Sequence, residues 1–178
     1  MQLVVLTGAS GSGKTTIADA IKTGWPGLVE VLHFDQIGVP SFEEMVSRWG
    51  SGEAWQRAMM LEWMTRIAAT GDPGGPVLFE GQTRLAFLRE ALDSVGLTNA
   101  HVILVDCDDA TRARRLTLAR KQPHLVNQKM MDWARFLRRE AHEAGYEVLD
   151  TATVPLVACI ELVRKRLGVS TDPPPIFW

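Results

Sequence analysis

A glycine-rich segment near the N-terminus constrains the fold of this chain more than any other feature. The pattern Gly-x-x-x-x-Gly-Lys-Ser/Thr is matched without deviation by Gly8-Ala9-Ser10-Gly11-Ser12-Gly13-Lys14-Thr15. An apolar run, Leu3–Thr7, precedes this segment, and an amphipathic stretch, Lys14–Lys22, follows it. In that setting glycines let the backbone fold around a phosphate, and the N-terminus of the next helix adds its positive dipole end. The pattern therefore predicts a strand, a phosphate-binding loop and a helix in succession.

Short apolar runs alternate with amphipathic stretches along the rest of the chain. The first run and four later ones predict strands at Leu3–Thr7, Val29–His33, Val77–Glu80, His101–Asp106 and Glu147–Thr151. The other stretches predict helices at Lys14–Lys22, Ser41–Trp49, Glu53–Ala69, Arg84–Val95, Ala110–Lys121, Gln128–Ala144 and Val154–Leu167. Strand runs that are apolar throughout are typical of parallel strands buried on both faces. The alternation predicts an α/β protein with a parallel sheet between layers of helices.

Composition narrows the class of protein further. The length of 178 residues, with 46% apolar and 22% charged residues, predicts a single domain over 1–178. The 19 Lys and Arg residues against 21 Asp and Glu residues exclude a generally basic surface, so nucleic acid is not an expected partner. The two cysteines, Cys107 and Cys159, match no metal spacing and predict reduced thiols in a cytoplasmic protein. No apolar stretch approaches the length of a membrane span, and the sequence predicts no particular oligomeric state.

The glycine-rich segment, with a strand before it and a helix after it, resembles the P-loop of nucleotide and small-molecule kinases. Chain length and element order are similar to those of the adenylate kinase, shikimate kinase and gluconate kinase group, from Met1 to about Leu167. The resemblance implies a P-loop NTPase three-layer sandwich with a five-stranded parallel sheet of order 2-3-1-4-5 and a short lid. It also implies ATP and Mg²⁺ as cofactors. The nucleotide-binding residues that it implies are Gly8, Ala9, Ser10, Gly11, Ser12, Gly13, Lys14, Thr15 and Thr16.

Four side chains, two in the glycine-rich segment and two at or after the third predicted strand, complete the predicted metal and acceptor sites. We expect Lys14 to neutralise phosphate charge and Thr15 to bind Mg²⁺ through its hydroxyl. The segment from Leu78 to Arg84 is similar to the Asp-Gly-Phe-Pro-Arg segment of adenylate kinases, with Gln-Thr in place of Phe-Pro. This similarity implies that Glu80 supports Mg²⁺ through water and that Arg84 binds an acidic group of the acceptor. The alternative is that both side chains are merely solvated at the ends of their elements.

Asp35 follows the second predicted strand directly, in Leu32-His33-Phe34-Asp35. The carboxyl ends of parallel strands face the ligand crevice, so this carboxylate can orient an acceptor hydroxyl and remove its proton. Shikimate-type and polynucleotide kinases carry an aspartate at a similar place. Shikimate-type kinases usually have another aspartate two residues earlier, where this chain has His33, which argues against a shikimate kinase proper. The alternative is that Asp35 only caps a turn.

Four arginines follow the fourth predicted strand: Arg112, Arg114, Arg115 and Arg120. Arg115 and Arg120 resemble the Arg-Leu-x-x-x-Arg entry to a kinase lid, which implies a lid over 115–133. Lid arginines neutralise charge on the transferring phosphoryl group, and Arg120 is the expected catalytic one. The alternative is that the arginines form the solvated face of a helix.

The insert between the second and third strands, residues 38–75, is the candidate acceptor-binding segment. It contains Phe42, Trp49, Trp55 and Trp63, whose helical spacing favours core packing over a pocket for a ring-bearing acceptor. On its longer helix, Glu53 with Arg57 and Glu62 with Arg66 have the four-residue spacing of helical ion pairs. The insert ends in a glycine- and proline-rich break over 71–76, and the chain ends in a proline-rich tail over 170–178.

These features predict an enzyme that transfers a phosphoryl group from ATP·Mg²⁺ to the hydroxyl or phosphate of a small-molecule acceptor. Lys14, Asp35 and Arg120 are the expected catalytic residues, with Asp35 and Arg84 on the acceptor. Three alternatives remain open: a nucleoside or nucleoside monophosphate kinase, a nucleic-acid end kinase, and a regulatory P-loop ATPase without a small-molecule acceptor. The sequence does not name the acceptor, because a fold does not determine its substrate.

Overall fold

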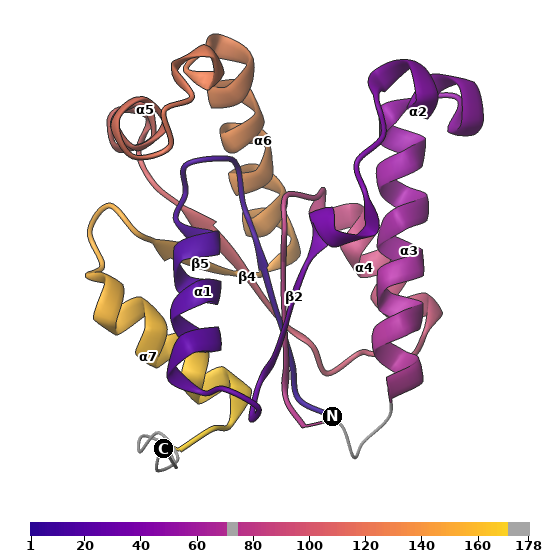
Figure 1. Ribbon diagram of the computed structural model, residues 1–178, viewed down its shortest axis with the longest axis vertical. Helices are drawn as coiled ribbons and strands as arrows, with labels where there is room; N and C mark the ends of the chain where they lie inside the picture. Colours follow the sequence, from indigo (N-terminus) through magenta and orange to yellow (C-terminus); the bar gives the residue numbers. More distant parts are fainter. Residues whose placement is uncertain (71–74, 171–178) are drawn as a thin grey trace.

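The computed structural model describes residues 1–70 and 75–170, so the predicted tail beyond Ser170 and the break at 71–74 lie outside the described residues (Figure 1). The elements are β1 (Leu3–Thr7), α1 (Lys14–Gly24), β2 (Glu30–His33), the 3₁₀ turn η1 (Phe34–Ile37), α2 (Phe42–Trp49), α3 (Gly52–Thr70), β3 (Val77–Gly81), α4 (Leu85–Ser94), β4 (His101–Asp106), α5 (Asp109–Arg114), the π-helical segment η3 (Arg115–Ala119), the 3₁₀ turn η4 (Pro123–Leu125), α6 (Gln128–Ala144), β5 (Glu147–Asp150) and α7 (Leu156–Leu167). No helix in this part of the chain is long and apolar enough to cross a bilayer.

The five strands form one parallel sheet of order β2-β3-β1-β4-β5, as predicted. The register places Thr7 of β1 opposite Gly81 of β3, and His33 of β2 opposite Glu80 of β3. Three strands therefore end at the same edge of the sheet. This edge carries the residues that follow each strand, among them the glycine-rich loop after β1.

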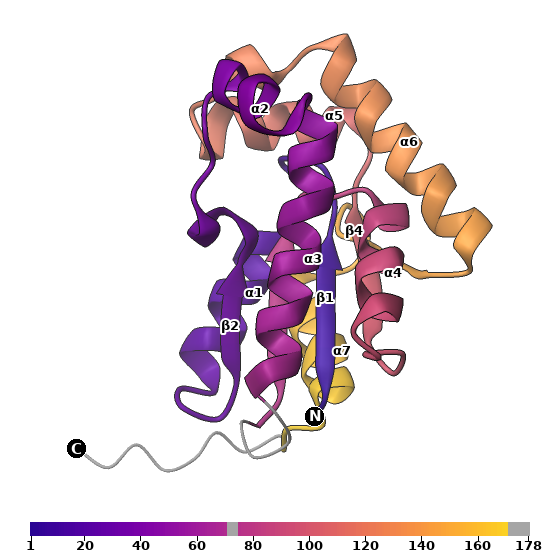
Figure 2. The ribbon, with the colours of Figure 1, turned by 90° about the vertical axis from the view of Figure 1, so that its right-hand side faces the viewer.

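Helices cover both faces of the sheet and give a three-layer sandwich (Figure 2). On one face α1 and α7 pack on the strands, with Ile17 and Val163 fully buried between them. On the other face α3, α4 and α6 bury a larger set of apolar side chains. This set includes Trp55 and Trp63, so the core packing that their spacing favoured is confirmed. Phe42, by contrast, is largely exposed on α2.

The predicted helix Ala110–Lys121 is wrong in its second half. Helix α5 ends at Arg114 and the chain continues in the wider π-helical turn Arg115–Ala119. The Arg120 N–H donates to the carbonyl of Arg115, and Lys121 has a φ of 53°, which stops any helix. The other predicted helices and strands agree with the structure to within two residues at each end.

One predicted helical ion pair is confirmed and the other is wrong. Glu62 pairs with Arg66 along α3 at 2.8 Å. Glu53 pairs instead with Arg84, and Arg57 pairs with Glu90 of α4. Helix α4 packs beside α3, so it offers these two side chains partners that lie far away in the sequence.

Candidate active site

The glycine-rich loop joins the buried strand β1 to helix α1 at the carboxyl edge of the sheet. Gly8 and Gly13 have φ values of 153° and 98°, which side-chain-bearing residues rarely adopt. A Cβ atom at Gly8 would also overlap the carbonyl oxygen of Val105 on β4. The loop can therefore take this path only with glycine at these positions.

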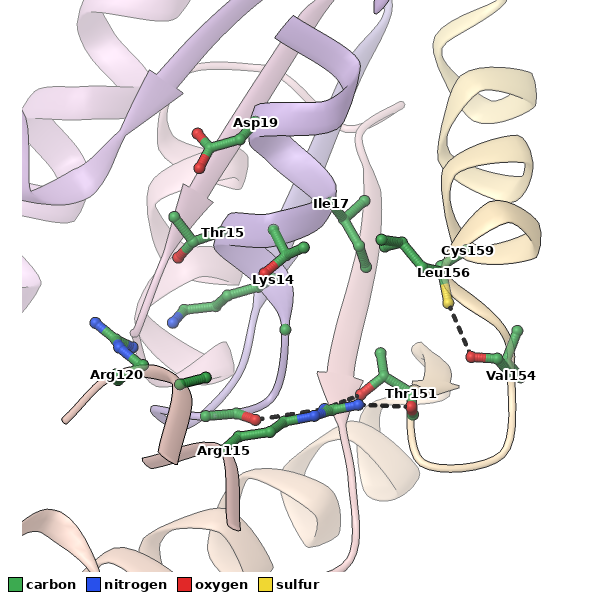
Figure 3. Close-up of a pocket in the computed structure, with 14 residues that line it drawn as sticks. Lys14, Thr15, Ile17, Asp19, Arg115, Arg120, Thr151, Val154, Leu156 and Cys159 are labelled. Carbon is green, nitrogen blue, oxygen red and sulfur yellow. Dashed lines mark hydrogen bonds between the residues drawn. The ribbon is translucent and has the colours of Figure 1, made fainter. Parts of the chain in front are cut away.

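A cavity of about 450 Å³ opens beside this loop (Figure 3). Its lining combines the loop and α1 with the π-helical segment and the chain after β5. The lining residues are Gly11, Gly13, Lys14, Thr15, Thr16, Ile17, Asp19, Arg115, Ala119, Arg120, Thr151, Val154, Leu156 and Cys159. Five of the predicted nucleotide-binding residues therefore line one cavity: Gly11, Gly13, Lys14, Thr15 and Thr16.

The buried carboxylate of Glu80 lies at the centre of the loop's polar contacts. Its Oε1 atom accepts a hydrogen bond from the Thr15 hydroxyl at 3.1 Å and lies 3.4 Å from the Lys14 ammonium. Its Oε2 atom is 2.8 Å from Nδ1 of His33. The structure thus brings together the predicted residues Lys14, Thr15 and Glu80. The sequence did not predict the contact with His33, whose position opposite Glu80 depends on the β2–β3 register.

Charges from three elements act on Lys14. Burial lowers the pKa of Lys14 and is the largest effect, and Glu80 opposes it by raising the pKa. Arg120 lowers the same pKa further, and Asp35 raises it. Asp35 lies on η1 and is exposed, while Arg120 is exposed beyond the π-helical segment and lines the cavity. Both predicted catalytic side chains therefore lie within electrostatic range of Lys14, although neither hydrogen-bonds to it.

Arg115 and Thr151 hold the loop from the wall of the cavity. The Arg115 guanidinium donates to the carbonyl of Ser12 at 3.2 Å and to the hydroxyl and carbonyl of Thr151 at 2.7 and 2.8 Å. The Thr151 hydroxyl in turn donates to the Ser12 carbonyl at 2.6 Å. These contacts occupy loop carbonyls, and the Ser12 N–H donates to the Ala9 carbonyl at 3.2 Å. The N–H groups at the start of α1 are a typical site for an anion. Arg115 is thus anchored to the loop, at the start of the segment 115–133 that was predicted as a lid.

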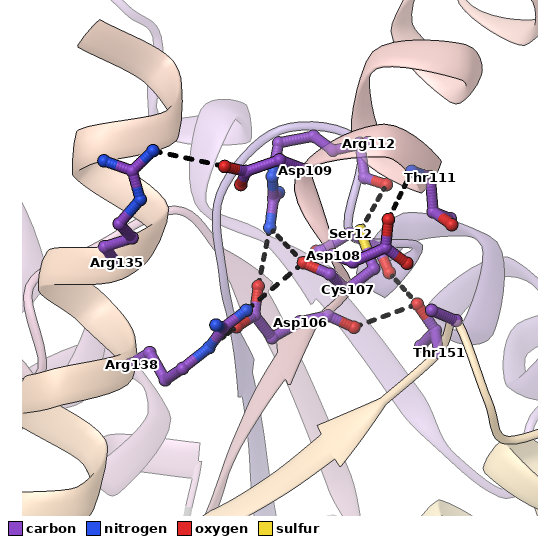
Figure 4. A network of polar contacts seen from close by, with 12 residues as sticks. Ser12, Asp106, Cys107, Asp108, Asp109, Thr111, Arg112, Arg135, Arg138 and Thr151 are labelled. Atoms are coloured by element: carbon purple, nitrogen blue, oxygen red, sulfur yellow. Dashed lines mark hydrogen bonds and ion pairs between the residues drawn. The ribbon is translucent and has the colours of Figure 1, made fainter. Parts of the chain in front are cut away.

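A second arginine, Arg112 of α5, also holds the loop (Figure 4). Arg112 is fully buried, donates to the Ser10 carbonyl at 2.9 Å and pairs with Asp106 at 2.6 Å. Arg138 of α6 pairs with the other oxygen of Asp106, also at 2.6 Å. For Arg112, the interpretation as a solvated helix face is therefore wrong. No local signal shows that Arg112 is buried, because its partners come from β4 and the loop.

Arg84 lies away from the cavity beside the loop. It precedes α4, and its guanidinium pairs with Glu53 of α3 at 2.5 Å. The guanidinium also lies 5.0 Å from the ring centre of Phe87 and 4.9 Å from that of Phe136. Its predicted role in holding the acceptor stays a prediction. The position is a wall of a different cavity, between α3 and α6.

The described residues fit a magnesium nucleotide better than a metal held by protein alone. No group of three or more metal-ligating His, Cys, Asp or Glu side chains occurs among them. Mg²⁺ is usually bound by one or two protein oxygens together with substrate phosphates and water. The Thr15 hydroxyl and the Glu80 carboxylate, 3.1 Å apart, offer such a pair of oxygens next to the glycine-rich loop.

No protein-family model matches the sequence, and no curated protein matches it. Solved structures do match over nearly the whole chain. The tunicamycin resistance protein of Deinococcus radiodurans superimposes with a TM-score of 0.70 at 19% identity, covering 98% of this chain and 100% of that one. The chain has the fold of the P-loop kinases. A sugar kinase from a Janibacter species matches with a TM-score of 0.66 at 22% identity, covering 96% of each chain. The shikimate kinase of Acinetobacter baumannii, in complex with shikimate, matches with a TM-score of 0.63 at 15% identity over 94% of each chain.

Proposed function

We propose that this P-loop protein transfers the terminal phosphoryl group of ATP to a hydroxyl of a small-molecule acceptor. The observation that carries the proposal is the placement of Asp35. Its carboxylate is exposed at the carboxyl edge of the sheet, within electrostatic range of Lys14. Nucleotide binding alone needs no carboxylate at that position, whereas a neutral alcohol reacts poorly until a base orients it and takes its proton.

The residues divide the work of phosphoryl transfer between binding and chemistry. The loop N–H groups bind the phosphates, and Lys14 neutralises the negative charge that develops on them. Mg²⁺, when bound, shields the phosphate oxygens, and Thr15 and Glu80 are the residues that would hold it. His33 fixes the second oxygen of Glu80 and so keeps that carboxylate aimed at Thr15. Asp35 orients the acceptor hydroxyl and accepts its proton, and Arg120 adds positive charge from the cavity beside the loop.

The comparisons support a small molecule as the acceptor. Matching structures carry the names shikimate kinase, gluconokinase and sugar kinase. Another matching structure is named a tunicamycin resistance protein, so antibiotics belong in an acceptor screen beside sugars and cyclitols.

The experiment that tests this function is a screen of ATP consumption over hydroxylated metabolites, nucleosides and antibiotics. Wild-type protein and the Lys14→Met variant are compared in the presence of Mg²⁺. We expect at least one acceptor to stimulate ATP consumption by the wild type only, with a phosphorylated product detected by mass spectrometry. Hydrolysis that no acceptor stimulates, in any class of the screen, would instead support a regulatory ATPase.

A further inference from the structure

A second cavity, of about 410 Å³, opens between the start of α3, the β3–α4 junction and α6. Figure 2 shows α6 running past the first turns of α3 and α4. The lining residues are Gly52, Glu53, Gln56, Arg84, Trp133 and Phe136. None of them lines the cavity beside the glycine-rich loop.

Two glutamine side chains join this second cavity to the glycine-rich loop. Gln56, in the cavity wall, donates from Nε2 to the carbonyl of Gln82 at 3.2 Å. It also accepts from the backbone N–H of Arg84 at 3.3 Å. The Gln82 side chain accepts in turn from the hydroxyl of Ser10 in the loop, at 3.1 Å. Two hydrogen bonds, from Gln56 to Gln82 and from Ser10 to Gln82, therefore connect the cavity wall to the phosphate-binding loop.

The charge in the cavity wall is already compensated. The Arg84 guanidinium pairs with Glu53 at 2.5 Å and lies 3.8 Å from the carboxylate of Glu140. The neighbouring cations have partners of their own, because Arg57 pairs with Glu90 and Arg139 lies 4.0 Å from Glu143. Among the residues that line the cavity, the one guanidinium and the one carboxylate cancel, and the guanidinium has no free charge to offer a ligand. A carboxylate or phosphate on the ligand would therefore lose its hydration without gaining a cation unless it first displaced Glu53.

The remaining wall is aromatic. The rings of Trp133 and Phe136 stack with centres 5.5 Å apart and planes 14° apart. The indole N–H of Trp133 is buried without a hydrogen-bond partner among residues 1–70 and 75–170. That nitrogen is closed off by the surrounding side chains, so the part of Trp133 that the cavity offers is apolar ring surface. An apolar or aromatic ring can pack on the exposed part of the stacked pair.

We propose that this cavity seats the acceptor and selects ring-bearing alcohols without a negative charge over those that carry a carboxylate or phosphate. The inference rests on the proposed function, because only a phosphoryl-transfer enzyme has an acceptor. It gives Arg84 a different task from the predicted one, because the guanidinium holds Glu53 and the ring of Phe136 in place and grips no acidic group.

Two matched glycosides test the selection. Phenyl β-D-glucoside and phenyl β-D-glucuronide share both rings and differ in one carboxylate. Binding of each is measured by isothermal titration calorimetry without nucleotide, so the result does not depend on phosphoryl transfer. We expect the wild type to bind the glucoside about fivefold more tightly or better. Tighter binding of the glucuronide, or binding of neither probe at millimolar concentration, would overturn the proposal.

Variants locate the selection in this cavity. Glu53→Gln frees the charge of Arg84 and should lower the preference for the glucoside about fivefold or more, while Glu62→Gln, on the same helix, should leave it unchanged. Trp133→Ala removes half of the aromatic wall and should weaken glucoside binding several-fold. An unchanged preference in Glu53→Gln would overturn the proposal. If the preference is found but no acceptor is ever phosphorylated, the proposed function fails while the assignment of the cavity stands.

Discussion

On the donor side of the site, which comprises the glycine-rich loop, α5, η3 and the end of β5, buried polar side chains hold the backbone in place. Arg112, Arg115 and Thr151 all donate to loop carbonyls, and Arg112 is fully buried. The proposed acceptor side comprises η1, α2, α3 and Arg84, and there aromatic packing replaces the buried polar contacts. Phe34 and Trp55 meet edge to face at 5.6 Å, and the ion pair between Arg57 and Glu90 is half exposed.

The difference shows how the two halves can serve different tasks. A phosphate needs N–H groups at fixed positions, and side-chain contacts to the carbonyls of Ser10 and Ser12 help to fix them. An acceptor site must match the shape of its acceptor. Apolar side chains that form such a site can differ from one protein to another without disturbing the loop. The contrast therefore predicts large effects for changes on the donor side and small ones for surface changes on the acceptor side.

The largest effect should come from Lys14→Met. This change removes the buried cation beside Glu80 while keeping an unbranched side chain of similar length. Lys14 is the lysine that contacts Glu80 in the described residues, and the imidazole of His33 is the other nitrogen group there. Without the lysine charge beside the loop, we expect turnover to fall about 10³-fold or more. Steady-state kinetics measures the loss, and circular dichroism checks that the variant is folded. Turnover near the wild-type rate would show that the loop is not the active site.

Arg112→Met should cost the most stability. It breaks a buried ion pair and leaves Asp106 with only Arg138, which is half exposed, so we expect a loss of about 3 kcal/mol in the free energy of unfolding. Urea titration measures this loss.

The matched change on the acceptor side is Arg57→Met. It removes a surface ion pair with Glu90 and should cost about 1 kcal/mol or less. Equal losses in Arg57→Met and Arg112→Met would contradict the contrast between the two sides.

Smaller effects should separate the two predicted magnesium ligands. Thr15→Val removes a hydroxyl beside the loop and should raise the Mg²⁺ concentration needed for half-maximal activity about tenfold or more. Glu80→Gln should shift it less if the carboxylate acts through water. Thr23→Val, an exposed change on the same helix, serves as the control. Unchanged Mg²⁺ titrations in both site variants would remove the metal assignment.

Local patterns in the sequence predicted the fold and the donor loop well. The glycine pattern lies within one short segment, and the strand runs are apolar enough to mark a buried parallel sheet. The sheet order followed from the resemblance to kinases and is confirmed. Where a helix is regular, as in Gln128–Ala144, its ends were also predictable.

Contacts between distant residues were not predictable in the same way. His33 meets Glu80 because the register of β2 and β3 pairs them, and Arg112 is buried because the loop folds over it. The pairing of Glu53 with Arg84 depends on how α3 packs against α4. A pattern within one helix points to Arg57 as the partner of Glu53, and tertiary packing overrides it. The stacking of Trp133 on Phe136 likewise depends on the fold, because only the finished helix α6 sets the two rings against each other.

The role of Asp35 as the base that serves the acceptor is tested most directly by two measurements on Asp35→Asn, made with the best acceptor from the screen. We expect affinity for ATP·Mg²⁺ to stay within a few-fold of wild type, while acceptor-dependent phosphorylation falls about 10²-fold or more. Asp93→Asn, an exposed change at the end of α4, should alter neither quantity. Phosphorylation of that acceptor by Asp35→Asn at near the wild-type rate would contradict this role and leave Asp35 as the cap of a turn.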